Sequence, residues 1–155
     1  MGKIVEYTRD NLLFSTNKEM IDIIAVHHYL SEESYWAKGI PFERVELSIR
    51  NSLCAGIYDE GKQVAFARVI TDCASFAYLC DVFVLKQYQG KGLGKWLLES
   101  IHSLPELQGL RRWMLATRDA HGLYRQFGWQ HLQEEQVSRF MQLHNPDVYE
   151  TARRI

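Results

Sequence analysis

The chain has 155 residues, 46% of them hydrophobic, and its formal net charge at pH 7 is −1. That length suits one domain, with enough apolar residues to bury a core without help from metals or disulfides. Because the charges nearly cancel and no basic run occurs, we expect neither nucleic acid nor a membrane surface as the main partner. No apolar run approaches the roughly 20 residues of a membrane span and no signal-peptide core follows the start, so we expect a cytoplasmic protein.

Three cysteines, Cys54, Cys73 and Cys80, lie in largely apolar, strand-like surroundings. Their odd number and the lack of Cys-x-x-Cys spacing favour reduced thiols over a disulfide framework. A zinc site formed with His27 and His28 is the alternative, but the spacing of metal ligands is absent. We therefore expect no metal.

The chain begins with strand patterns and then a helix. Residues 3–8 alternate as a first strand, and residues 11–15 continue it after a turn at Arg9 and Asp10. Thr16 or Asn17 can then cap a helix. The residues at helical spacing that mark its buried face are Met20, Ile23, Ile24, His27 and Leu30.

Residues 31–41 break any period and contain two large aromatic residues, Tyr35 and Trp36. Aromatic side chains in loops often line binding sites, so we predict that these two bind the substrate. The alternative is a hydrophobic lid over the core. Pro41 then suits the first position of a helix that is expected to reach about residue 52.

Three strands are predicted in the middle of the chain. Residues 53–58 and 63–71 are two β-type runs joined by the turn Asp59-Glu60-Gly61-Lys62, a pattern typical of a hairpin. Residues 75–85 supply the next strand and lead into a glycine-rich stretch.

The C-terminal part alternates in the same way. Residues 111–117 are predicted to form a strand and residues 120–127 a short helix that ends at Gly128. Residues 129–132 and 138–143 are expected to be closing strands. Since no repeat or linker interrupts the pattern, the sequence indicates one mixed α/β domain over residues 1–155.

Three alternating glycines, Gly90, Gly92 and Gly94, connect the strand over residues 75–85 to a stretch with amphipathic helical spacing. Glycine can take a positive φ and lie close to a bulky anion, and successive N–H groups at a helix start favour phosphate. Lys91 and Lys95 add positive charge at the rim. A solvated Gly-rich connection is the alternative.

Two familiar phosphate motifs do not fit this stretch. A P-loop requires a glycine and a hydroxyl residue where the chain has Gln89 and Trp96. A Rossmann fingerprint that begins at Gly90 requires a small residue where the chain has Lys95. Both motifs are therefore excluded by position.

The pattern Gln89-x-x-Gly92-x-Gly94, after a strand ending Val82-Phe83-Val84, resembles the acetyl-CoA pyrophosphate loop of the GNAT superfamily of N-acetyltransferases. A second stretch, Leu123-Tyr124-Arg125-Gln126-Phe127-Gly128-Trp129, is similar to the family's Leu-Tyr-x-x-Phe-Gly-Phe pattern, and only the last aromatic differs. Both motifs occur in the family's order, and the resemblance covers residues 53–143. It implies the GNAT acyl-CoA acyltransferase fold, in which helices flank a mostly antiparallel central sheet.

The resemblance also implies acetyl-CoA as co-substrate. In such a site the strand backbone pairs with the pantetheine arm, one amide points at the acetyl oxygen, and the glycine loop holds the pyrophosphate. The residues to which this role is carried over are Val82, Phe83, Val84, Gln89, Gly90, Lys91, Gly92, Leu93, Gly94 and Lys95.

Tyr124 aligns with a tyrosine that in many relatives protonates the leaving thiolate; the alternative is an aromatic that packs between helix and sheet. Its reference pKa of about 10 lies above the roughly 8.5 of a thiol, so outright transfer is uphill by about 2 kcal/mol without local tuning. His121 is expected to relay a proton, with a solvated loop histidine as the alternative. Asp119 is expected to cap the short helix.

The general base is less well defined. Many relatives carry a glutamate at a position corresponding to Tyr78 or Cys80, and this chain departs from that pattern. Asp81 is adjacent, but strand alternation points it to the opposite face from Cys80 unless the strand has a bulge. Asp81 is expected to act as the base or to bind the amine, unless it hydrogen-bonds a neighbouring strand or a water chain takes the proton.

The resulting hypothesis is an N-acetyltransferase that moves acetyl from acetyl-CoA to a primary amine on a small molecule or peptide by direct attack. The alternative is a noncatalytic acyl-CoA-binding or sensing module. Nothing in the sequence fixes the acceptor or the acyl chain, or decides between a monomer and a homodimer.

Overall fold

The computed structural model describes residues 2–153, with side chains up to residue 150. The chain divides into two compact units, residues 1–116 and 117–155. The first holds the whole sheet and the second holds three short helices. That residues 1–155 form one domain stays a prediction.

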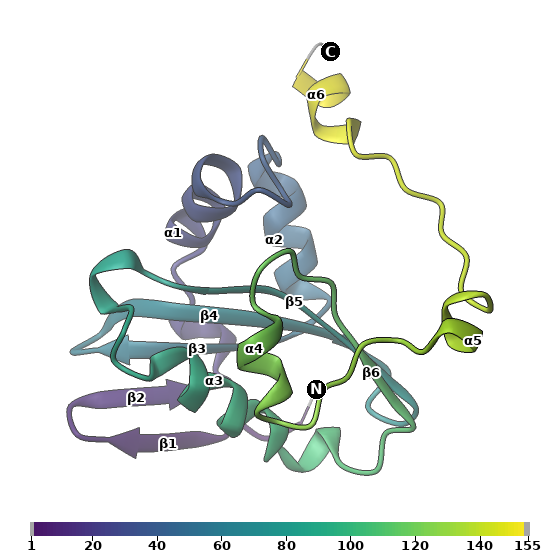
Figure 1. The fold of residues 1–155 in the computed structure, drawn as a ribbon. Coiled ribbons are helices and arrows are strands. Elements are labelled where there is room, and N and C mark those ends of the chain that lie inside the picture. The colour runs from purple at the N-terminus through teal and green to yellow at the C-terminus, as the bar shows by residue number, and fades with distance from the viewer. Residues whose placement is uncertain (1, 154–155) are drawn as a thin grey trace. The chain divides into compact units, whose positions relative to one another are not determined.

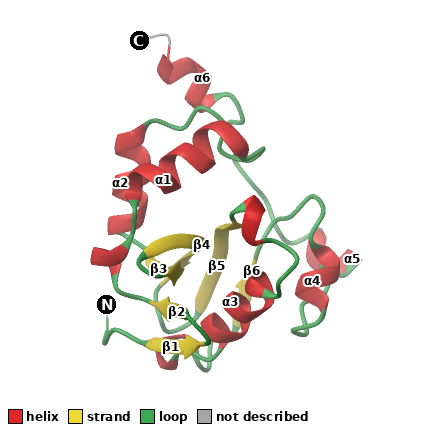
Figure 2. Ribbon diagram, turned by 90° about the vertical axis from the view of Figure 1, so that its left-hand side faces the viewer, coloured by secondary structure: helices red, strands yellow, loops and turns green. Residues whose placement is uncertain are grey.

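A six-stranded sheet forms the centre of the first unit, with its strands in sequence order (Figures 1 and 2). Neighbouring strands are antiparallel except for the last pair, which is parallel. The mostly antiparallel α/β fold predicted from the sequence is therefore confirmed. The strands are β1 (Glu6–Arg9), β2 (Leu12–Ser15), β3 (Leu53–Asp59), β4 (Lys62–Thr71), β5 (Phe76–Val84) and β6 (Arg112–Met114).

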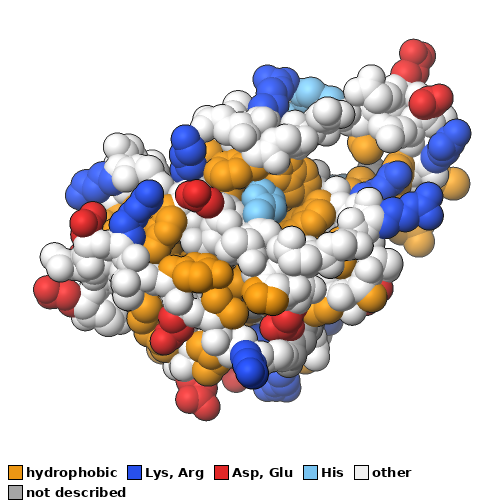
Figure 3. All heavy atoms as spheres, turned by 90° about the horizontal axis from the view of Figure 1, so that it is seen from below, with side chains coloured by type: hydrophobic (Ala, Val, Ile, Leu, Met, Phe, Trp, Pro, Cys, Tyr) orange, Lys and Arg blue, Asp and Glu red, His pale blue; other side chains and the backbone are white. Residues whose placement is uncertain are grey.

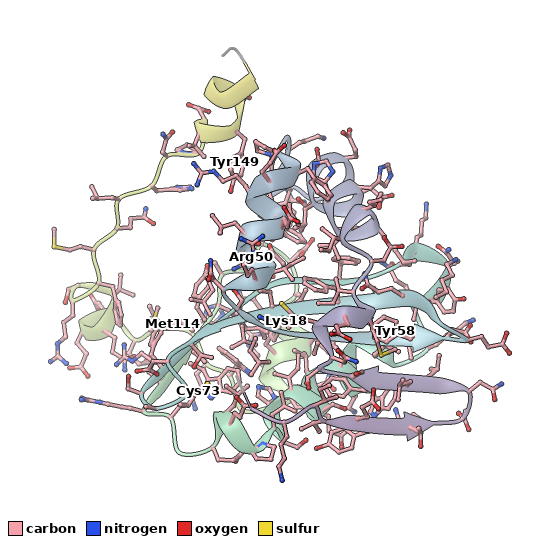
Figure 4. The ribbon with its side chains drawn as sticks, turned by 180° about the vertical axis from the view of Figure 1, so that it is seen from behind. Lys18, Arg50, Tyr58, Cys73, Met114 and Tyr149 are labelled. Atoms are coloured by element: carbon pink, nitrogen blue, oxygen red, sulfur yellow. The ribbon has the colours of Figure 1, made fainter. Side chains whose placement is uncertain are left out.

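The predicted hairpin between β3 and β4 is present. Its turn places Glu60 at φ 49° and Gly61 at φ 85°, the two positive values that a tight two-residue hairpin turn requires. Within β3, the ring of Tyr58 lies over Gly56, where a Cβ atom would come within 2.7 Å of the hydroxyl oxygen (Figure 4). Position 56 thus has space only for glycine. The burial of the Tyr58 side chain also raises the pKa of its hydroxyl.

The helix predicted after residue 16 is broken into pieces. A 3₁₀ helix, η1 (Lys18–Met20), is capped by Asn17, after which α1 (Ile23–His28) is capped by Asp22 and continues as the π-helical η2 (Tyr29–Glu33). The prediction that Ile24 is buried is wrong, since it is 74% exposed and Val26 is buried instead. The buried residues of α1 and η2 are Val26, Leu30 and Ser31, so Leu30 is buried as predicted.

Helix α2 (Phe42–Arg50) follows Pro41 as predicted. It lies with α1 on one face of the sheet, while α3 (Leu93–His102) packs against β3, β4 and β5 from the other face (Figure 1). The Lys18 Nζ atom donates to the Arg50 carbonyl at 3.0 Å and ties η1 to the end of α2 (Figure 4). In α3, Trp96, Leu97 and Ile101 are buried.

The second unit contains α4 (His121–Arg125), α5 (Glu134–Val137) and α6 (Val148–Arg153). The closing strands predicted over residues 129–132 and 138–143 are wrong, because neither range is a strand in the described structure. Gln133 and Gln136 form a reciprocal capping box that favours helix α5. Met141 and Leu143 have relative exposures of 97% and 106%, so they bury no apolar face of a strand.

The surface mixes charges of both signs, as the face in Figure 3 shows. Among residues 2–153, no helix is both long and apolar enough to cross a membrane.

Candidate active site

The parallel pair of β5 and β6 separates after three residues. Phe76, Ala77 and Tyr78 pair with residues 112–114, and beyond Tyr78 the described part of β5 pairs only with β4. Residues 79–84 therefore keep one strand edge available for an extended ligand that carries amide groups. The backbones of Val82, Phe83 and Val84, predicted to bind the co-substrate, lie on this open part of β5.

A β-bulge interrupts β5 at the start of its open edge. Phe66 pairs with Phe83 while Arg68 pairs with Cys80, so Ala67 opposes both Asp81 and Val82. Asp81 has φ 53°, a conformation that costs a non-glycine residue of order 1–3 kcal/mol. The strand therefore has the bulge that the sequence left open. Side chains do not alternate simply between the two faces of the sheet at Asp81.

The Asp81 carboxylate is held by two side chains. Its Oδ2 atom accepts from Arg68 Nε at 2.8 Å, and its Oδ1 atom accepts from Trp36 Nε1 at 2.9 Å. Arg68 also donates from Nη1 to the Ser52 hydroxyl at 3.0 Å. The ion pair is largely buried, with side-chain exposures of 15% for Arg68 and 9% for Asp81.

Burial is the largest single influence on Arg68 and lowers its pKa, but the charge and the hydrogen bond of Asp81, together with smaller contributions from Cys80 and Cys54, raise the pKa of Arg68 overall. Neither Arg68 nor Ser52 was predicted from the sequence as a site residue. A charged residue inside the otherwise apolar run of β4 was the signal that could have identified Arg68.

Aromatic side chains lie beside the Arg68–Asp81 ion pair. Tyr29 stacks on Phe83 with ring centroids 4.0 Å apart, and its ring lies 6.4 Å from that of Trp36. Tyr35 meets Trp36 edge-on at 5.0 Å. Tyr35 and Trp36 are 44% and 41% exposed, so solvent reaches both rings. The structure therefore brings together the three residues predicted to bind substrate, Tyr35, Trp36 and Asp81.

Two thiols flank Arg68 across the sheet, Cys54 on β3 and Cys80 on β5. Burial raises the pKa of Cys54 to about 11 and that of Cys80 to about 12. Both are therefore protonated at neutral pH. All three cysteines are free, and no group of three His, Cys, Asp or Glu side chains in the described residues could hold a metal ion.

Two of the three glycines after β5 have the positive φ that was expected, whereas Gly94 lies within helix α3. A 3₁₀ helix, η3 (Lys86–Tyr88), leads to Gly90 at φ 77° and Gly92 at φ 79°. Gln89 donates from Nε2 to the Val84 carbonyl at 2.9 Å and thereby fastens the loop to the end of β5.

This loop fits an anion. Gly92 is the N-cap of α3 and has no side-chain cap, so the amides of residues 93–95 find no acceptor within the described chain. A Cβ atom at position 90 or 92 would meet nothing within 4 Å, which leaves open space beside the backbone. Lys91 and Lys95 are exposed at this helix start, where positive charge and free amides favour phosphate.

The remaining predicted residues, Tyr124 and His121, belong to the second unit. Tyr124 lies in α4, is 8% exposed and meets Trp129 edge-on with ring centroids 6.0 Å apart. His121 stacks with His131 at 4.9 Å. The prediction that Asp119 caps the helix is wrong, because the N-cap is Ala120, whose amide donates to the Thr117 hydroxyl.

Three comparisons connect this geometry to known proteins. Residues 50–131 match the family model of the acetyltransferase (GNAT) domain. A protein of Gibberella zeae assigned as an acetyltransferase is 33% identical over an alignment of 140 residues, and the match covers 76% of this chain and 78% of that protein. A crystal structure assigned to the GNAT family, from Xanthomonas campestris pv. campestris, is 44% identical with a TM-score of 0.86, covering 92% of this chain and 99% of its own.

A solved structure of lower identity shares the fold alone. The ribosomal-protein-S18-alanine N-acetyltransferase of Escherichia coli has a TM-score of 0.64 at 22% identity, and the match covers 79% of each chain.

Proposed function

The chain belongs to the GNAT superfamily of N-acetyltransferases, whose members use acetyl-CoA as co-substrate, and from this we propose that it transfers acetyl from acetyl-CoA to a primary amine of a small molecule or peptide by direct attack. One observation carries the proposal. The bulged open edge of β5 leads directly into a glycine loop whose helix amides have no acceptor in the described chain.

On the donor side, the chain acts mainly through its backbone. The open edge of β5 supplies N–H and C=O groups to the amides of the pantetheine arm, and an N–H from Val82, Phe83 or Val84 stabilises negative charge on the acetyl oxygen. The amides at the start of α3 bind the pyrophosphate, and Gly90 and Gly92 leave space for its approach. The residues present thus fit the donor.

On the acceptor side, Asp81 acts as an orienting group. Its carboxylate is already shared between Arg68 and Trp36, but each oxygen retains a lone pair for an N–H of the incoming amine. Tyr35 and Trp36 provide an aromatic wall beside it. We assign removal of the amine proton to water, because the adjacent Cys80 is protonated and the charge of Asp81 is paired with Arg68, which leaves Asp81 to accept a hydrogen bond from the amine.

The reaction forms one C–N bond and breaks one C–S bond. The amine nitrogen gives up its proton to water, and the departing thiolate sulfur takes up a proton to form the CoA thiol. From the resemblance to the family, we assign this proton to the Tyr124 hydroxyl, and Tyr124 regains a proton from solvent through His121. Tyr124 supplies this proton in concert with C–S cleavage, which avoids the uphill outright transfer.

The test combines a binding and a turnover measurement. CoA binding is measured by calorimetry, and thiol release from acetyl-CoA is followed with a panel of polyamines, amino acids, aminoglycosides and peptides. The proposal expects CoA binding and release that depends on at least one amine. Tight CoA binding with no acceptor-dependent release would support the alternative, a noncatalytic acyl-CoA-binding or sensing module.

A further inference from the structure

Two lysine ammonium groups converge on one tyrosine ring beside the glycine loop. Lys62 Nζ lies 5.6 Å and Lys91 Nζ 5.5 Å from the centroid of Tyr88. The two lysines come from different segments: Lys62 is the first residue of β4, directly after the hairpin turn, and Lys91 lies in the glycine loop. Because they share one ring, their charges are at most about 11 Å apart.

The tyrosine is fixed in place by the same hairpin. The Tyr88 hydroxyl donates to Asp59 Oδ2 at 3.0 Å, and Asp59 pairs with Lys62 in the β3–β4 register. Tyr88 therefore holds the hairpin turn against the loop and keeps both lysines near it.

The charges of both lysines stay available to a ligand. Within the described residues, neither Lys62 nor Lys91 forms an ion pair. The acidic groups nearest this cluster are Asp59, which already accepts from Tyr88, and Glu60 in the turn. Two unpaired ammonium groups on a rigid aromatic support, next to a phosphate loop, suit an anion of more than one charge.

We propose that Lys62 and Lys91, held by Tyr88, recognise the 3′-phosphate of CoA, an inference that rests on the proposed function. Pyrophosphate oxygens carry one charge per phosphorus and suit the backbone amides of the loop. A phosphomonoester carries about −1.5 to −2 at neutral pH and calls for ammonium groups. The pair therefore distinguishes CoA from its dephosphorylated form, while the glycine loop binds both.

The test measures dissociation constants for CoA and 3′-dephospho-CoA by calorimetry. The unchanged protein is expected to prefer CoA by about tenfold, as two exposed ion contacts together provide. Lys62→Gln should reduce this preference about two- to fivefold through weaker CoA binding, with the dephospho-CoA constant unchanged. Lys91→Gln should reduce the preference by a similar factor, but it should also weaken dephospho-CoA binding, because Lys91 lies in the loop that binds the pyrophosphate. The preference should also fall as salt rises.

Lys86→Gln is the matched control, because Lys86 is an exposed lysine of the same segment that does not lie over Tyr88. The preference of the Lys86→Gln variant for CoA over 3′-dephospho-CoA should equal that of the unchanged protein. The inference is overturned if the unchanged protein binds both ligands equally, or if Lys62→Gln weakens both alike; the proposed function survives either result. Failure to bind either ligand overturns both.

Discussion

Replacing Asp81 by Asn removes one charge from the bulge while preserving its shape. Asn tolerates φ near the observed 53° as well as Asp does, and its Oδ1 atom can still accept from Trp36. The contact that changes is the 2.8 Å ion pair with Arg68. Asp81→Asn therefore isolates what that pair contributes to the folded bulge.

The size of the effect follows from how deeply the pair is buried. Removing one partner of a fully buried pair costs about 3–5 kcal/mol, since the other charge is left uncompensated. With side-chain exposures of 15% and 9%, solvent screens part of this charge. We expect Asp81→Asn to lower the free energy of unfolding by about 2–3 kcal/mol after that discount.

Urea unfolding followed by tryptophan fluorescence measures the change. With a slope of about 2 kcal/mol per molar, the midpoint should fall by about 1–1.5 M. Asp119→Asn is the control, because Asp119 is exposed and makes no hydrogen bond in the described chain; it should shift the free energy by less than about 0.5 kcal/mol.

A double-mutant cycle of Asp81→Asn with Arg68→Met tests whether the two side chains stabilise the fold together. The two single variants should cost more in sum than the double variant, by a coupling of about 1–2 kcal/mol. A coupling below about 0.5 kcal/mol, or an Asp81→Asn variant as stable as the Asp119→Asn control, would refute the assignment of the ion pair as the anchor of the bulge.

Three further variants address the proposed chemistry. Tyr124→Phe should lower kcat about 100-fold with CoA affinity unchanged, and equal turnover at saturating substrates would remove its role as proton donor. Cys80→Ser should retain turnover, because burial raises the pKa of this thiol to about 12 and keeps it protonated at neutral pH; acetyl found on Cys80 by intact-protein mass spectrometry would contradict direct attack. Gly92→Ala, at φ 79°, should cost about 1 kcal/mol of stability and weaken CoA binding in calorimetry, whereas Gly122→Ala, in helix α4 with open space around it, should do neither.

The sheet could be predicted because apolar periodicity is a local signal. The runs that became β3, β4 and β5 were recognised from their β-prone residues and from the Glu60-Gly61 turn, whose left-handed backbone is a property of the turn itself. The glycine loop was recognisable for the same reason.

Features that depend on neighbouring strands could not be predicted. The bulge at Asp81 arises from its register against β4, and its sequence neighbours give no sign of it. The position of Arg68 beside Asp81 follows from the same register. Likewise Ile24 is exposed despite its helical spacing, and residues 138–143 form no strand in the described structure, because the spacing of apolar residues does not specify the surface against which they pack.

Acetyl transfer that depends on an acceptor amine is the most direct test of the proposed N-acetyltransferase activity. The protein is incubated with acetyl-CoA carrying an isotope-labelled acetyl group and with each amine of the panel, and the products are identified by mass spectrometry. We expect labelled acetyl on the nitrogen of at least one amine, in an amount equal to the CoA released. CoA binding without labelled amine, across the whole panel, would contradict it.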